Sequence, residues 1–234
     1  MNLATKERRI HDRVEVKDHA VFVEHKSGID LRVGNLGYSG MLLAGALPGG
    51  ELPGGEISGT LKVLDMTVPA TGHVVRASTE GLGVLFDHSS GELLQALRLV
   101  LDPARYGMTM VAMNKNYVPN EYRGPDWLVF QGLGPTCLAA RYASPAHLQV
   151  TEFSLTIKPG GFQVVEYRDG EMTTGVKREG QAAHNVAVYD HVNAEQKRTL
   201  RRAAGVLFGM VGAGFGAQVV PLLDVIGALM SPRT

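Results

Sequence analysis

Short apolar segments separated by glycine and polar turn residues dominate the first third of the chain. Segments rich in Val, Leu and Phe occupy residues 14–16, 20–26, 30–36, 40–45, 57–66, 68–77 and 81–87. Apolar runs of this length, bounded by turn residues, are typical of β-strands. Several short strands at regular spacing are typical of a small barrel or sandwich. The pattern therefore predicts a mainly β N-terminal domain, which we expect to be a small antiparallel β-barrel.

The hydrophobic period changes after this region. Leu93, Leu94 and Leu97 recur at helical spacing, and Ser89 or Ser90 is suited to cap the helix that they predict. The residue before a proline avoids the helical region, so we expect the helix to end at Asp102-Pro103. We therefore divide the chain into two domains, residues 1–104 and residues 105–234.

The second domain mixes strand and helix patterns. Predicted strands cover residues 126–134, 147–157, 161–167 and 172–178, with a further candidate at 184–192. Asp169-Gly170 favours a tight hairpin turn between the predicted strands at 161–167 and 172–178. Asn193 and Gln196 resemble a capping box before a helix that starts near residue 194. We expect an α+β domain of unknown function that ends in apolar helices.

The run from residue 203 to residue 230 permits two interpretations. Between Ala203 and Leu223 only Gln218 is polar, and the length reaches the roughly 20 residues that a membrane-spanning helix needs. Small residues at four-residue spacing would also let helices approach closely: Gly205, Gly209, Gly212 and Gly216. Pro221 and Asp224 interrupt the second half, which favours two shorter helices split near Pro221 and buried in the domain or in a dimer interface.

Composition narrows the functional classes. The chain carries 23 basic and 23 acidic residues, and this neutrality argues against a DNA-binding or RNA-binding surface. Its one cysteine, Cys137, excludes an intramolecular disulfide and a cysteine-based metal site, and we expect a buried apolar role for it. No histidine lies at metal-ligand spacing, and no catalytic constellation is visible in residues 105–234. We predict a non-enzymatic protein without a metal.

The polar N-terminus of the chain lacks a secretory signal, which predicts a cytoplasmic location. Contact with a membrane through residues 203–230 stays open.

Two motifs point to a ligand. Arg9 and Arg13 form an R-x-x-x-R pair directly before the first predicted strand. About twenty residues later, Asn35, Gly37 and Gly40 fit the frame [D/N]-x-S-x-x-G followed by an apolar strand. In this order and at this spacing, the two motifs resemble the PilZ family, whose members bind the bacterial second messenger cyclic di-GMP. The resemblance covers residues 6 to about 101. It implies a β-barrel with a closing helix, and a role in the regulation of motility or biofilm formation.

The residue types suit this ligand. Cyclic di-GMP carries two phosphodiesters and two guanines, and arginine can bind phosphate bidentately, stack on a purine or donate a fork to guanine. By resemblance, Arg9 and Arg13 would close around the ligand, and Asn35 would hydrogen-bond the guanine. Gly40 would permit a turn or a close backbone approach. Two further candidates are Arg8, beside the arginine pair, and Arg76, at the end of a predicted strand, although both are also consistent with solvated surface charges.

Gly37 departs from the family frame, because it occupies the serine position. A missing neutral hydrogen bond lowers affinity by about 0.5–1.5 kcal/mol, or roughly three- to tenfold.

From the resemblance we expect a cyclic di-GMP receptor that passes the signal to its C-terminal domain or to a protein partner, with self-association through the C-terminal helices as an alternative. The competing hypothesis is a non-binding, PilZ-like scaffolding module of a pilus, flagellar or secretion assembly.

Overall fold

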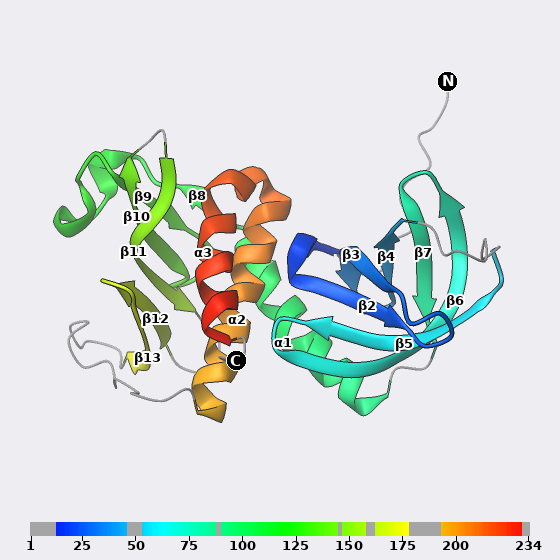
Figure 1. Ribbon diagram of the computed structural model, residues 1–234. Helices are drawn as coiled ribbons and strands as arrows, with labels where there is room; N and C mark the ends of the chain where they lie inside the picture. Colours follow the sequence, from blue (N-terminus) through cyan, green and yellow to red (C-terminus); the bar gives the residue numbers. More distant parts are fainter. Residues whose placement is uncertain are drawn as a thin grey trace, which may run out of the picture. The chain divides into compact units, whose positions relative to one another are not determined.

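Two compact units divide the chain, at residues 1–97 and 98–234, and Figure 1 labels their elements. The computed structural model describes residues 13–45, 53–87, 90–144, 147–157, 162–177 and 193–230. Helix α1 (Gly91–Gly107) runs through the division between the units. The predicted strand at 184–192 lies outside the described residues.

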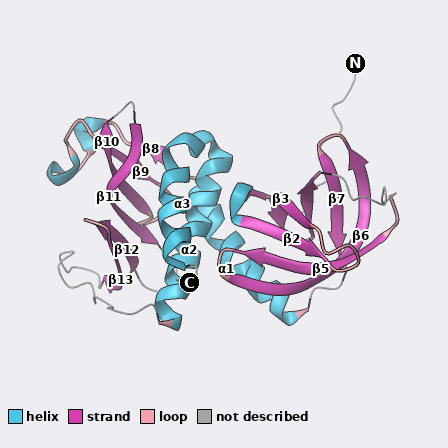
Figure 2. Ribbon diagram, viewed as in Figure 1, coloured by secondary structure: helices cyan, strands magenta, loops and turns pink. Residues whose placement is uncertain are grey.

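Unit 1 is a closed six-stranded antiparallel β-barrel (Figure 2). Around the barrel the strands follow the order β3-β2-β5-β6-β7-β4, and β4 pairs with β3 to close it. The strands are β1 (Val14–Glu15), β2 (Ala20–Glu24), β3 (Asp30–Gly37), β4 (Gly40–Ala44), β5 (Glu56–Val63), β6 (Met66–Ser78) and β7 (Gly81–Phe86). A short 3-10 helix, η1 (Lys17–His19), separates β1 from β2. The predicted N-terminal barrel is confirmed, and its strands lie close to the predicted ranges. The turn between β5 and β6 is at Leu64–Asp65, earlier than the predicted break after Met66.

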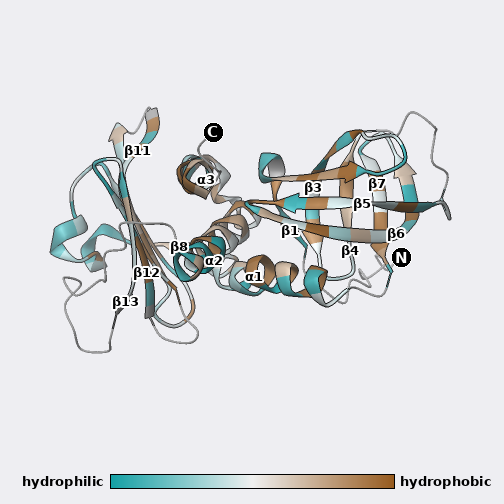
Figure 3. Cartoon of the chain, turned by 60° about the horizontal axis from the view of Figure 1, so that its bottom comes forward, coloured by the Kyte–Doolittle hydropathy of each residue, from teal (hydrophilic) through white to brown (hydrophobic). Residues whose placement is uncertain are grey.

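Alternation along the strands builds the core of the barrel. Figure 3 shows hydrophobic positions alternating with polar ones along the barrel strands. Eight inward side chains are at most 1% exposed: Phe22, Val33, Leu36, Met41, Leu43, Leu61, Val74 and Val84. Because successive side chains of a strand point to opposite faces, the intervening residues form the outer surface.

Unit 2 contains a six-stranded antiparallel sheet in which each strand pairs with its neighbour in sequence. The strands are β8 (Val111–Ala112), β9 (Trp127–Gln131), β10 (Cys137–Ser144), β11 (His147–Ile157), β12 (Phe162–Arg168) and β13 (Glu171–Lys177). Two 3-10 helices, η2 (Lys115–Tyr117) and η3 (Asn120–Tyr122), lie between β8 and β9. The predicted turn between β12 and β13 is confirmed, with φ values of 53° at Asp169 and 85° at Gly170. Positive φ at both central residues is the mark of a type I′ hairpin.

Strands β8 and β10 were not expected from the sequence. Alanine is a weak strand former, and the segment that contains Ala139 and Ala140 lacks the β-branched pattern of its neighbours. Its place between β9 and β11 supplies hydrogen bonds on both edges, and Leu138, Ala139 and Ala140 are at most 2% exposed. Cys137, at the start of β10, is half-buried beside the apolar cluster of Val118, Val129 and Ala139, so it is less buried than expected.

The apolar C-terminal run folds as a helical hairpin. Helix α2 (Ala194–Met210) leads through a π-helical turn (Val211–Phe215) into α3 (Gly216–Met230), and the two helices pack together. The predicted break near Pro221 is wrong. The chain bends at Gly214, whose φ of 95° only glycine adopts readily, whereas Pro221 lies within α3. The Asn193 side chain caps α2 by accepting from the Gln196 main-chain N–H at 2.8 Å. The Gln196 side-chain oxygen Oε1 has no partner among the described residues.

The hairpin packs against the sheet of unit 2, and this packing weakens the interpretation of the apolar run as a membrane-spanning helix. Helix α2 contacts β11, β12 and β13, and the Tyr142 hydroxyl donates to the Gln218 carbonyl oxygen of α3 at 2.6 Å. Residues 194–230 are long and apolar enough to cross a membrane by length and composition, but half of the apolar window is buried. As folded, each helix is about 22–26 Å long, which is shorter than the roughly 30 Å hydrocarbon core of a bilayer. The predicted burial of these helices is confirmed for the second half of α2.

Helix α1 starts as predicted but ends later than predicted. The Ser90 hydroxyl caps it by accepting from the Leu93 N–H at 3.2 Å, and the helix continues through Pro103 to Gly107. Close packing against α2 stabilises this last turn. A Cβ at Gly209 would overlap the Ala104 carbonyl oxygen, and a Cβ at Gly107 would overlap the Val206 carbonyl oxygen. This backbone contact compensates for the hydrogen bond that a proline removes from a helix interior.

We predict that Gly209→Ala destabilises unit 2 by about 1–3 kcal/mol or more, because its methyl group forces two helix backbones apart. Gly212→Ala is the matched control three residues away, since no atom lies within 4 Å of its new methyl group. We expect the control to leave stability unchanged or to raise it. Urea unfolding followed by the fluorescence of Trp127, the only tryptophan, measures both variants in unit 2. Equal stabilities would contradict the close-packing account.

Candidate functional site

The second sequence motif lies at the hairpin between β3 and β4. Gly37 pairs with Gly40 across a two-residue turn formed by Tyr38 and Ser39. The Ser39 carbonyl oxygen accepts from the Phe86 N–H at 2.9 Å, which attaches the turn to β7. A Cβ at Gly40 would overlap the Val84 carbonyl oxygen. The expected close backbone approach at Gly40 is therefore present, and it holds β4 against β7.

The first motif ends beside this hairpin because β1 and β2 share one edge of β3. Strand β2 pairs with residues 30–32 of β3, and β1 pairs further along through Val14 with Leu36 and Glu15 with Asn35. Arg13 directly precedes Val14 and is half-buried. The antiparallel register therefore brings Arg13 to the Gly37 end of β3. The structure thus gathers four predicted site residues, Arg13, Asn35, Gly37 and Gly40, in one region.

A row of paired residues extends from this region across the outside of the barrel. Cross-strand pairing connects Glu15, Asn35, Leu42, Gly83 and Arg76 in that order, over β1, β3, β4, β7 and β6. Directly paired residues point to the same face, and the sequence neighbours Leu36, Met41 and Val84 are at most 1% exposed in the core. The row is therefore external. Arg76 and Asn35 lie three strand spacings apart, which is roughly 14 Å.

A second external row runs parallel to the first. It continues from Gly37 and Gly40 to Leu85 and His73. Leu85 is 48% exposed, and the His73 Nδ1 lies 2.7 Å from a carboxylate oxygen of Asp87. The outer face beside the hairpin therefore offers an aliphatic surface with polar groups at its margins. We name these two rows the outer face.

Asn35 carries an unsatisfied polar atom. Its side-chain carbonyl oxygen is buried, and no hydrogen-bond partner for it exists among the described residues. Buried polar atoms in folded proteins are nearly always paired with protein groups or water, so this oxygen is available to accept a hydrogen bond. An acceptor oxygen requires a donor, which is the type of group that the edge of a guanine base provides.

Charges of both signs surround the outer face. Arg76 pairs with Glu80 at 3.5 Å, with both side chains more than 60% exposed. An exposed ion pair contributes little stability, so Arg76 can exchange this carboxylate for a phosphate at low cost. Glu15 lies opposite Asn35, and its negative charge opposes an anionic ligand there. Arg32 forms a separate exposed pair with Asp18 at 3.0 Å.

Two predicted site residues, Arg8 and Arg9, lie outside the described residues. Within the described ranges, no group of three His, Cys, Asp or Glu side chains could hold a metal ion. Sequence reasoning did not identify Leu42, Gly83, Leu85 and His73 as members of the outer face. Their alignment with Asn35 depends on strand register, which no local motif encodes.

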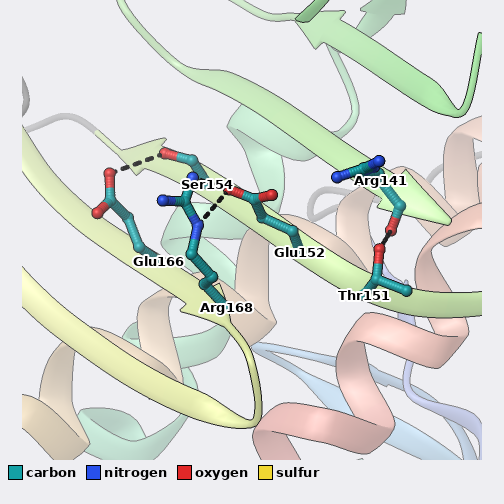
Figure 4. A network of polar contacts seen from close by, with 6 residues as sticks. All are labelled: Arg141, Thr151, Glu152, Ser154, Glu166 and Arg168. Atoms are coloured by element: carbon teal, nitrogen blue, oxygen red, sulfur yellow. Dashed lines mark hydrogen bonds and ion pairs between the residues drawn. The ribbon is translucent and has the colours of Figure 1, made fainter. Parts of the chain in front are cut away.

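A polar cluster in unit 2 has a structural explanation (Figure 4). Cross-strand pairing places Arg141, Glu152 and Arg168 in a row over β10, β11 and β12. The Arg168 Nε donates to Glu152 at 2.7 Å, and this bond and the Glu152 charge raise the pKa of Arg168. Beside this pair, the Ser154 hydroxyl lies 3.4 Å from the Glu166 carboxylate oxygen Oε1. Because Glu152 and Arg168 pair their opposite charges, the cluster links β11 to β12 and contributes to the stability of the sheet.

No protein-family model matches the chain, and no curated protein matches its sequence. The PilZ resemblance therefore rests on the two motifs, on the closed barrel and on the proximity of the motifs in the structure.

We predict that Asn35→Val leaves the stability of unit 1 within about 0.5 kcal/mol of the wild type or raises it. The substitution removes an unsatisfied oxygen and supplies a good strand former. Glu24→Ala is the control, because the Glu24 carboxylate accepts from the Lys26 N–H, the Ser27 N–H and the Ser27 hydroxyl at 2.6–2.7 Å. We expect the control to lose more than about 1 kcal/mol. Differential scanning calorimetry measures both, and a comparable loss in Asn35→Val would give Asn35 a structural role.

Proposed function

We propose that unit 1 is a cyclic di-GMP receptor that binds its ligand on the outer face beside the β3–β4 hairpin. The observation that carries this proposal is the pairing of β1 with β3. It brings Arg13 to Asn35 and Gly37, and Asn35 holds a buried acceptor without a partner among the described residues. Arg13, the last residue of the first motif, therefore lies beside the second motif, although about twenty residues separate the two motifs in sequence.

The residues match the chemistry of the ligand. The N–H groups on the guanine edge donate to the Asn35 carbonyl oxygen and satisfy it. Arg13, together with Arg9, supplies guanidinium groups that bind the phosphodiesters bidentately or stack on the purine. Leu42 and Leu85 provide apolar surface on which the ligand lies. Arg76, at the far end of the row, contacts the second half of the ligand once it leaves Glu80.

The N-terminal segment that carries Arg9 and Arg13, which we call the arginine arm, is the element that transmits the signal. A ligand shifts a conformational equilibrium only through contacts that differ between the free and bound states. Arg9 and Arg13 make such contacts, since they bind phosphates that are present only in the complex. Binding therefore holds the residues before β1 against the barrel and changes the surface that unit 1 offers to unit 2 or to a partner protein.

Two features reduce the affinity that we expect. Gly37 lacks the hydroxyl of the family frame, and Glu15 places a carboxylate opposite Asn35. We therefore propose a dissociation constant near the micromolar range, which corresponds to about 8 kcal/mol of binding free energy.

Gly37 also favours one alternative function. A barrel that lost the hydroxyl contact could serve as a non-binding scaffolding module of a pilus, flagellar or secretion assembly, with the C-terminal helices as its docking element. The unsatisfied Asn35 oxygen argues against this alternative, because a purely structural site gains nothing from an unpaired buried acceptor.

Isothermal titration calorimetry of the full chain with cyclic di-GMP tests the proposal. We expect Arg9→Ala, Arg13→Ala and Asn35→Ala each to weaken binding, by roughly 10- to 100-fold for the arginines, since bonds to charged groups contribute about 1.5–3 kcal/mol. Arg32→Ala is the matched control, because Arg32 is an exposed arginine on the same strand as Asn35. Gly37→Ser restores the hydroxyl and should tighten binding roughly three- to tenfold.

The same titration distinguishes the alternatives. The absence of binding to the folded wild type would favour the scaffolding module. Equal losses in Arg13→Ala and Arg32→Ala would indicate general attraction of the ligand to positive charge, which would contradict a defined site.

A further inference from the structure

Three of the uncharged stretches of unit 2 lie together in the fold. They cover residues 106–114, 127–140 and 203–223. The third is the apolar run of the helical hairpin, and the other two belong to the region around β8, β9 and the start of β10.

The fold brings these stretches together at one end of unit 2. The Phe130 and Phe215 rings meet edge to face with centroids 5.0 Å apart, which joins β9 to the π-helical turn. The Leu133 N–H donates to the Thr109 hydroxyl at 3.0 Å, which joins the β9–β10 loop to the segment before β8. Figure 1 shows the turn between α2 and α3 beside β8. We name residues 108–112, 132–134 and Val211–Phe215 the tip.

The tip exposes aliphatic side chains to solvent. Val111 is 61% exposed and Leu133 is 63% exposed. Val111 pairs with Gln131 at the end of β9, and Leu133 follows in the β9–β10 loop. The Leu133 N–H bond to Thr109, two residues before Val111, brings the loop beside the segment that carries Val111. Ala112, Ala213 and the glycines of the turn add small exposed apolar groups. Single exposed aliphatic residues are ordinary, but neighbouring ones on an uncharged surface mark a contact site.

Basic residues predominate where the uncharged stretches end. Arg105 and Lys115 bracket the first stretch, and both are exposed. The residues that flank the other two stretches are Asp126, Arg141, Arg202 and Asp224. Four of these six flanking residues are therefore cations. Burial, with the neighbouring charge of Arg198, lowers the pKa of Arg202, so the exposed Arg105 and Lys115 are the cations best placed to meet an external anion.

We propose that the tip is a peripheral contact site for an anionic lipid bilayer. Val111 and Leu133 enter the boundary between headgroups and acyl chains, and Arg105 and Lys115 bind headgroup phosphates. An uncharged aliphatic surface with cations at its margin has the composition of an interfacial membrane contact. In a symmetric dimer the same surface would face its own copy, which would bring like charges together at the margin. The contact requires neither a membrane-spanning helix nor the binding of cyclic di-GMP.

Co-sedimentation of the full chain with vesicles tests this proposal. The probes are phosphatidylcholine vesicles and mixed phosphatidylcholine–phosphatidylglycerol vesicles. We expect binding to the mixed vesicles that weakens with salt, and Leu133→Asp should lower the partition coefficient roughly tenfold or more. Val75→Asp is the matched control, since Val75 is a 55% exposed aliphatic residue on the barrel, and it should bind like the wild type. Arg105→Glu with Lys115→Glu should reduce binding to the mixed vesicles only.

Trp127 fluorescence and circular dichroism establish that each variant is folded. The proposal is overturned if the folded wild type sediments with neither kind of vesicle, or if Leu133→Asp and Val75→Asp bind equally well. Light scattering that detects a dimer in the wild type and a monomer in Leu133→Asp would assign the tip to a second copy of the chain and would also overturn the lipid proposal.

Discussion

Strand β3 pairs along both edges, and the architecture of unit 1 depends on this double pairing. One edge carries β1 and β2, while the other carries β4, so the sheet closes into a barrel at β3. The same pairing brings the end of the arginine arm to the motif on the β3–β4 hairpin. Gly40 is needed at this point because β4 packs directly against the backbone of β7. Closure of the barrel and assembly of the candidate site are therefore one structural event.

Unit 2 uses glycine for a different purpose. Gly107, Gly205 and Gly209 allow the backbones of α1 and α2 to touch, and Gly214 lets the apolar run reverse into a hairpin that lies against the sheet. A sequence long enough to span a bilayer is folded back on itself in this way. Two of the exposed aliphatic side chains of unit 2, Val111 and Leu133, lie at the tip.

Local patterns predicted the barrel well because alternation along a strand directly reflects burial. Other features depended on tertiary structure. Strand β10 is formed by its two neighbours and not by the propensities of Ala139 and Ala140, and α1 continues past Pro103 because Gly107 packs against α2. The motif residues of the candidate site were recognised, but the outer face was not. Irregular register near Gly34 and Val75 decides which residues face outward beside Asn35 and Arg76, and sequence alternation alone does not locate such shifts.

Hydrogen exchange of the full chain with and without cyclic di-GMP tests the central claim most directly, because it locates the ligand and the arm together. The account predicts that binding increases amide protection in residues 5–16 and in the β3–β4 hairpin, while the sheet of unit 2 keeps its protection. Binding that is detected by calorimetry but leaves residues 5–16 and the hairpin unchanged would contradict the account, because the ligand would then occupy a different surface.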